Sequence, residues 1–172
     1  MRFILEIESD RVTVMFRSQV IPADGGLIKG CNRVELELIA AGLFSREMNR
    51  ARLDGLTARI TGKSMRLLNL SEIRNFDPSC QREPPGSQTI PIDRIRGSES
   101  RCDDFDSDLR PLQDHTRQRW INIAVARISG TPLPAVNLIH LCGFYFIRDG
   151  HHRISVARAL GERYIDAVVT VG

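Results

Sequence analysis

A strand pattern turns into a helix pattern within two residues near the end of this 172-residue chain, at Asp149 and Gly150. The apolar run 144–148 predicts a strand, and the segment 151–160 predicts a helix that follows it at once. The first turn of a helix carries backbone N–H groups without intrahelical partners, and the helix dipole adds positive potential there. The corner therefore predicts an anion site, with phosphate as its ligand.

The residue types at this corner fit a phosphate. Gly150 has no Cβ to block an approaching phosphate, and Arg153 offers a guanidinium that can grip two oxygens. His151 and His152 can donate hydrogen bonds and can become cationic beside a phosphate. In the alternative interpretation, Asp149 only caps the helix, Gly150 only makes the turn, and the histidines decorate the surface. Zinc is not indicated, because adjacent helical residues diverge by about 100°.

The segment from residue 90 onward alternates strands and helices in a regular order. Strands are expected at 90–95, 134–141, 144–148 and 164–171, and helices at 115–129 and 151–160. The order β-α-β-β-α-β predicts an α/β (α+β) fold with a mixed sheet. Pro91 places the first of these strands at a sheet edge. Trp120 and His140 are expected in the interior.

The first half of the chain contains the patterns of a hairpin, a helix and a linker. Residues 1–22 alternate apolar and polar side chains around an acidic break, which predicts a β-hairpin, and a helix is expected at 32–44. Prolines and a glycine then indicate a linker. The expected division is an N-terminal hairpin and basic helical segment at 1–75, a linker at 76–89, and a phosphate-binding domain at 90–172.

A basic stretch at 46–74 has two interpretations. Leu53, Leu56 and Ile60 recur at helical spacing, which predicts a solvated helix packed along one apolar stripe. Alternatively, Arg50, Arg52 and Arg59 form a face that contacts DNA. The formal net charge of +3 and the pI near 8.9 do not by themselves indicate nucleic acid.

The length of the apolar runs and the spacing of the cysteines indicate the cellular compartment. No apolar run approaches the roughly 18 to 20 residues that span a membrane. The four cysteines are widely scattered without a C-x-x-C pair, which is typical of reduced cysteines. We therefore expect a cytoplasmic protein without a membrane partner. The sequence leaves open whether the chain forms a homodimer.

The segment 90–171 resembles the ParB N-terminal/sulfiredoxin superfamily. The resemblance rests on the strand 90–95, the loop Gly97-Ser98-Glu99-Ser100-Arg101-Cys102-Asp103-Asp104-Phe105 and the corner Asp149-Gly150-His151-His152-Arg153. It implies a nucleotide phosphate at the helix start: CTP in partition proteins, ATP in sulfiredoxins, ADP in archaeal free-serine kinases. The sulfiredoxin reaction is not expected, because His151 stands where those enzymes carry their catalytic cysteine.

The corner is most similar to that of the free-serine kinases. This branch implies Glu99 as general base toward a substrate hydroxyl, and Mg²⁺ held by Asp149 among others. The partition proteins imply a phosphate-holding role for Arg101. The expected function is Mg-dependent nucleotide hydrolysis or phosphoryl transfer, with ATP, ADP or CTP. A partition-type DNA-associated regulator and a nuclease stay open as alternatives.

Overall fold

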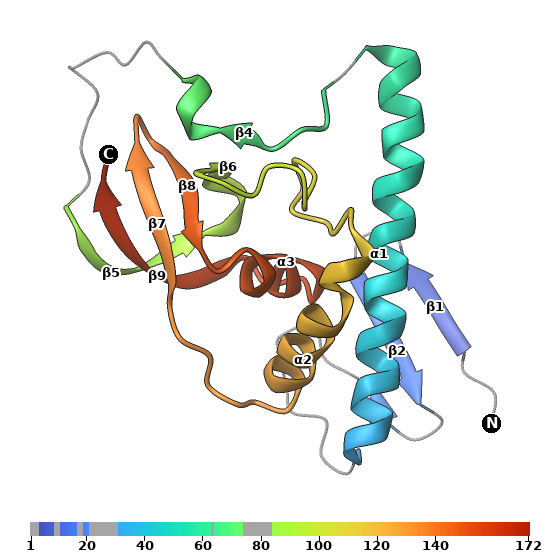
Figure 1. Cartoon of the computed structure of the whole chain (residues 1–172). Coiled ribbons are helices and arrows are strands. Elements are labelled where there is room, and N and C mark those ends of the chain that lie inside the picture. Colours follow the sequence, from blue (N-terminus) through green and yellow to red (C-terminus); the bar gives the residue numbers. More distant parts are fainter. Residues whose placement is uncertain (1–3, 9–10, 17–18, 21–30, 63, 74–83) are drawn as a thin grey trace.

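The structure is a computed structural model that describes residues 4–8, 11–16, 19–20, 31–62, 64–73 and 84–172. Near the N-terminus three strands pair antiparallel, which confirms the predicted hairpin and adds a short third strand. They are β1 (Ile4–Glu8), β2 (Arg11–Phe16) and β3 (Gln19–Val20). The remaining strands form a second, larger sheet (Figure 1).

The larger sheet has six strands in the order β4-β6-β8-β7-β9-β5. These are β4 (Leu68–Asn69), β5 (Gly86–Pro91), β6 (Ile95–Ser98), β7 (Val136–Leu141), β8 (Phe144–Asp149) and β9 (Tyr164–Val171). Parallel and antiparallel pairs both occur in it. The predicted α/β class with a mixed sheet is thereby confirmed.

The strand predicted at 90–95 is wrong as a single element. A 3₁₀ turn at Ile92–Arg94 splits it into β5 and β6. β5 lies at one edge of the sheet, as Pro91 predicted, whereas β6 lies on the other side, beside β8. Moving between these positions requires the chain to leave the sheet, and the 3₁₀ turn does this.

Among the described residues, three α-helices accompany the sheet: α1 (Arg33–Thr61), α2 (Arg117–Ile128) and α3 (His151–Ala159). The 32–44 segment and the basic stretch after it form one continuous helix, α1. It starts at a capping box between Asn32 and Glu35 and ends at Gly62 in the left-handed conformation. Figure 1 shows this long helix beside α2.

Helix α3 lies between α2 and the sheet (Figure 1). Ile154 and Ala157 pack into the core on the sheet, and Val156 packs into the core shared with α1 and α2. Trp120 is fully buried in this second core and donates a hydrogen bond from Nε1 to Ser155 Oγ (2.9 Å). His140 is 2% exposed. The predictions that Trp120 and His140 are interior are confirmed.

The apolar stripe expected to pack the basic helix is not packed. Leu53, Leu56 and Ile60 are 63%, 56% and 86% exposed. The side of α1 that meets α2 carries other residues, among them Ala40, Phe44 and Met48. The packed-stripe interpretation of Leu53, Leu56 and Ile60 is therefore wrong.

Two strands bear on the expected domain boundaries. β4, from the N-terminal segment, pairs in parallel with β6, so that segment contributes to the main sheet. β5 begins at Gly86, inside the expected linker. Residues 76–83 of that linker lie outside the described residues, and the division into domains stays a prediction.

No helix among the described residues combines the length and apolar character that crossing a membrane demands. Cys142 is part of a disulfide bond, so the expectation of reduced cysteines is wrong for this residue. A cytoplasmic location stays a prediction.

Candidate functional site

The corner between β8 and α3 has the geometry that the sequence predicted. Asp149 ends the strand, Gly150 is the N-cap residue with φ 103° and ψ 17°, and α3 begins at His151. The first backbone bond within the helix joins Ile154 N to Gly150 O (3.0 Å). In the described part of the chain, no side chain caps this helix start. Its first N–H groups therefore remain available to a ligand.

Gly150 is required for a different reason from the expected one. A Cβ at this position would lie 2.5 Å from Cγ1 of Val136 and 2.8 Å from its Cβ. The positive φ also disfavours any residue with a side chain. Glycine is thus needed for close packing of the corner against β7. The expectation from the sequence was that a Cβ would block the approaching phosphate.

His151 connects the helix start to the loop after β6. Its Nε2 lies 2.6 Å from Oγ of Ser98, which is completely buried. The same hydroxyl oxygen accepts hydrogen bonds from the backbone N–H groups of Ser100 and Arg101, both 3.2 Å long. Ser98 therefore fixes the start of the Arg101 loop relative to α3. Sequence reasoning missed this serine.

His152 is buried without a hydrogen bond on its ring nitrogen Nε2. The residue is 5% exposed, and this atom has no hydrogen-bond partner among the residues that the structure describes. Phe105 packs against both histidines, with its ring stacked on His151 and edge-on to His152. An unsatisfied polar atom in a buried position is costly, so His152 Nε2 is a candidate contact for a ligand.

Both histidines are held neutral near pH 7. Burial, followed by the charges of Arg101 and His152, lowers the pKa of His151 from 6.5 to about 4. Burial, followed by the charges of Arg119 and Arg101, lowers the pKa of His152 to about 4. The expectation that these histidines are cationic applies only when a bound anion offsets these effects.

Arg153 is held by the protein itself. Its Nη1 donates to the carbonyl oxygens of Pro134 (2.5 Å) and Ala135 (2.7 Å), and its Nη2 donates to Asp149 Oδ2 (2.6 Å). The side chain is 15% exposed. Arg153 thus connects α3 to the segment before β7, and only some of its N–H groups remain for a ligand. Its main visible role is to shape the corner.

A pocket of about 190 Å³ opens at the corner. We call it the corner pocket; it is lined by Arg101, Arg119, Ile123, Arg148, Asp149, Gly150, His151, His152 and Arg153. Arg119 comes from α2 and Arg148 from the end of β8. Four arginines and one aspartate give the lining an excess of positive charge. Sequence reasoning missed Arg119 and Arg148, although Arg148 directly precedes the motif.

The arginines of the corner pocket differ in how they are paired. Arg101 lies 3.5 Å from Asp104, and Arg148 lies 3.1 Å from Glu99. No acidic partner for Arg119 is found among the described residues. Exposed ion pairs of this kind contribute little, so a phosphate can compete for these guanidinium groups.

Glu99 does not line the corner pocket, but it is paired with Arg148, which does. Its backbone N–H donates to Ile147 O (2.9 Å), which aligns the loop with β8, and its carboxylate pairs with Arg148. Asp149 accepts from Arg153 through Oδ2. Within the described ranges, no three or more His, Cys, Asp or Glu side chains are grouped to hold a metal ion. Mg²⁺ therefore stays a prediction resting on Asp149 together with ligand oxygens.

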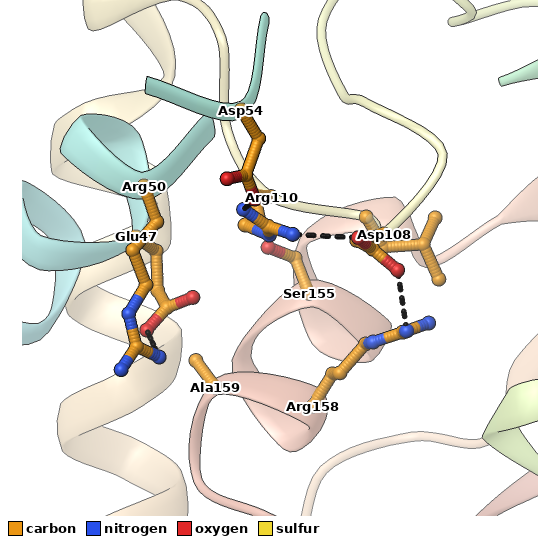
Figure 2. A pocket seen from close by; sticks show the side chains of 9 residues that line it. Glu47, Arg50, Asp54, Asp108, Arg110, Ser155, Arg158 and Ala159 are labelled. Atoms are coloured by element: carbon orange, nitrogen blue, oxygen red, sulfur yellow. Dashed lines mark hydrogen bonds and ion pairs between the residues drawn. The ribbon is translucent and has the colours of Figure 1, made fainter. Parts of the chain in front are cut away.

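A larger cavity of about 460 Å³ lies between α1, the loop before α2 and α3 (Figure 2). A chain of ion pairs crosses it, from Asp54 to Arg110 to Asp108 to Arg158. As Figure 2 shows, Arg50 stands on the opposite wall beside Glu47. Because its charges are already balanced against one another, we place the candidate site at the smaller corner pocket.

The predicted DNA-contacting residues do not form one face. Arg52 and Arg59 are exposed and lie seven residues apart on α1, which puts them on the same side. Arg50 is about 200° away from Arg52 around the helix and faces the larger cavity. The three arginines therefore do not share one side of α1, and contact of Arg50, Arg52 and Arg59 with DNA stays a prediction.

Comparison with known proteins returned one structural match. No protein-family model and no curated protein matches the chain. Among solved structures, a sulfiredoxin from Arabidopsis thaliana is similar to it, with 18% sequence identity and a TM-score of 0.40. That match covers 51% of this chain and 88% of the sulfiredoxin chain. The free-serine-kinase branch has no match among these comparisons.

Proposed function

We propose that the chain binds a nucleotide through its phosphates in the corner pocket. The observation that carries this proposal is the convergence of Arg101, Arg119 and Arg148 on the uncapped start of α3. Guanidinium groups and free helix N–H groups are the two donor types that bind phosphate best in proteins. Each comes from a different element, so only the folded chain brings them together.

The size of the pocket indicates which part of a nucleotide enters it. Pockets that enclose a whole drug-sized ligand measure about 300 to 1,000 Å³, whereas the corner pocket measures about 190 Å³. One or two phosphate groups fit this volume, and the nucleoside extends beyond it. The arrangement accounts for phosphate recognition and leaves the base, whether adenine or cytosine, to residues at the rim.

The reaction that we propose is hydrolysis or transfer of the terminal phosphoryl group. Glu99 is the candidate general base, because its carboxylate accepts a hydrogen bond from Arg148, which lines the pocket. A phosphate that engages Arg148 weakens that ion pair and frees the carboxylate to accept a proton. Mg²⁺ bound by Asp149 and phosphate oxygens would neutralise charge at the reacting phosphate.

Replacing Arg119 by alanine tests the binding site most cleanly. Arg119 is exposed and makes no acidic pair within the described part of the chain, so Arg119→Ala should leave the melting temperature unchanged. We expect affinity for ATP, ADP, CTP or pyrophosphate to fall on the order of tenfold or more, as for other charge-assisted contacts to phosphate. Titration calorimetry with and without Mg²⁺ measures this.

Arg163→Ala is the matched control, because Arg163 is an exposed arginine outside the corner pocket. It should bind every ligand as the unaltered chain does. If both variants lost the same affinity, the phosphate compounds would be held by the general positive charge of the protein and not by the corner pocket. If the unaltered chain binds none of these compounds at millimolar concentration, the proposal is wrong.

Glu99→Gln separates binding from turnover. Glutamine keeps the shape of the side chain but cannot accept a proton at neutral pH, so phosphate release should fall about 100-fold or more. Nucleotide affinity should stay within a few-fold, or rise, because Arg148 loses a competing anion. An assay of phosphate release measures the turnover, and titration calorimetry measures the nucleotide affinity. Unchanged turnover would assign Glu99 a purely structural role in its pair with Arg148.

A further inference from the structure

Helix α1 carries a second apolar face that points away from the rest of the protein. Val34 and Leu38 are 65% and 63% exposed near its start, and Leu53, Leu56 and Ile60 are 63%, 56% and 86% exposed near its end. We call these five residues the outer stripe. Isolated exposed apolar residues are ordinary, whereas an aligned set on one helix marks an interaction surface.

The outer stripe lies on one side of the helix, in two groups near its ends. Leu38 and Leu56 are 18 residues apart, which is five helical turns, so they point in the same direction. Val34 precedes Leu38 by four residues, and Ile60 follows Leu56 by four. The buried side of α1, with Ala40, Leu43, Phe44, Glu47 and Ala51, lies on the opposite side of the helix.

The spacing along this side is symmetric about residue 47. Between the two apolar ends, the same side of the helix continues through Ala41, Ser45 and Asn49, of which Ala41 is partly buried against the core shared with α2. The intervals from residue 34 to residue 60 are four, three, four, four, four, three and four residues, which reads the same from either end. Small side chains at the centre allow two helices to approach closely there.

Symmetric spacing is the property that a two-fold contact between identical helices requires. In such a contact, residue i of one copy meets residue j of the other, and j meets i. An antiparallel pair centred on residue 47 places Leu38 opposite Leu56 of the second copy. The same pairing places Val34 opposite Ile60 of the second copy. Every member of the outer stripe then faces an apolar or small residue.

Charge favours the antiparallel arrangement over the parallel one. Glu37 is paired with Arg33 of the same helix, whereas Glu35 lies near the start of α1 and Arg59 lies exposed near its end. Antiparallel pairing centred on residue 47 places Glu35 opposite Arg59 of the second copy, and it also opposes the two helix dipoles. Parallel pairing would set like charges side by side.

We propose that two copies of this chain associate through the outer stripe of α1, antiparallel and centred on residue 47. This inference is independent of nucleotide binding, because the stripe faces away from α2 and α3. The corner pocket lies on the other side of those helices and stays open in the pair. A dimer of this kind carries two corner pockets.

A charge pair built into the stripe tests both the contact and its direction. Leu38→Arg and Leu56→Glu, each alone, should weaken the dimer at least about 100-fold, because each places two unpaired charges in an apolar contact. The double variant Leu38→Arg/Leu56→Glu should dimerise again, since each arginine then meets a glutamate of the second copy. Within one helix these positions are about 27 Å apart, too far to pair with each other.

Sedimentation velocity on the full chain over a broad concentration range is the measurement. Tyr164→Glu is the matched control, because Tyr164 is an exposed apolar residue on β9 with 58% exposure. Circular dichroism confirms that each variant is folded. If the unaltered chain is monomeric at every concentration, the proposal is wrong and the stripe is covered by another segment or another protein. Failure of the double variant to regain the dimer excludes the antiparallel register.

Discussion

The free energy of unfolding should fall by about 2 to 3 kcal/mol for His151 alone between pH 7.5 and pH 4.5, given about 1.4 kcal/mol for each unit of pKa shift. In the folded chain the pKa of His151 is lowered from 6.5 to about 4. Between these values the unfolded chain binds a proton that the folded chain does not, so stability rises with pH there. Above pH 6.5 this contribution is complete, and it is lost as the pH falls toward 4.

His152 adds to this loss in the same direction, because its pKa is lowered to the same value. Asp106 acts in the opposite direction, since burial raises the pKa of its carboxyl. The informative quantity is therefore the change caused by substitution. His151→Gln should reduce the loss of stability between the two pH values, even if it lowers stability at pH 7.5.

Urea unfolding at several pH values measures this dependence. His115→Gln is the matched control, because the side chain of His115 is 69% exposed. It should alter the pH dependence far less than His151→Gln does, since the charge of His115 is the smallest of those that act on His152. A pH dependence that His151→Gln does not alter would contradict the burial of a neutral imidazole beside Ser98.

Gly150→Ala should destabilise the fold by about 2 to 4 kcal/mol, because it combines a strained backbone with a steric conflict. Gly150 has φ 103°, a conformation that residues with a side chain rarely adopt. The added methyl group would also lie 2.5 Å from Val136 Cγ1. Relief requires β7 and the start of α3 to move apart, which weakens the bonds from Arg153 to Pro134 and Ala135.

Gly55→Ala is the matched control for this substitution. Gly55 lies inside α1, and a Cβ there meets nothing within 4 Å. This control should stabilise the chain by up to about 1 kcal/mol, as alanine does in helices. Combining Gly150→Ala with Val136→Ala should recover part of the loss, because the nearest contact is removed. Equal stability of Gly150→Ala and the unaltered chain, measured by urea unfolding, would show that the corner can widen freely.

Local chemistry explains the predictions that succeeded. The change from an apolar run to a helical pattern at Asp149 and Gly150 identified the strand, the turn and the helix of the corner. Pro91 placed β5 at an edge, because proline has no backbone N–H to donate to a neighbouring strand. These features depend on neighbours in the sequence, so they can be derived without the fold. The mixed sheet followed from the order of the elements.

Predictions that needed partners distant in sequence were wrong or incomplete. Arg153 was expected to face a ligand, but Pro134, Ala135 and Asp149 accept hydrogen bonds from three of its five N–H groups. Arg50 carries the same charge as Arg52, yet it lies on the other side of α1. Leu53 and its neighbours have the spacing of a packed stripe, although the helix packs through its other side.

The sequence by itself determined the corner: a helix start directly after a glycine, with histidines and an arginine beside it. Its chemistry follows from residues adjacent in the chain, because backbone N–H groups and the φ of glycine are local properties. Only the tertiary structure decided which cations surround this helix start. Arg119 and Arg148 reach the pocket from α2 and β8, and Ser98 fixes the loop of Arg101. Such convergence depends on how the helices pack on the sheet, since residues far apart in sequence meet only when their apolar faces are buried together.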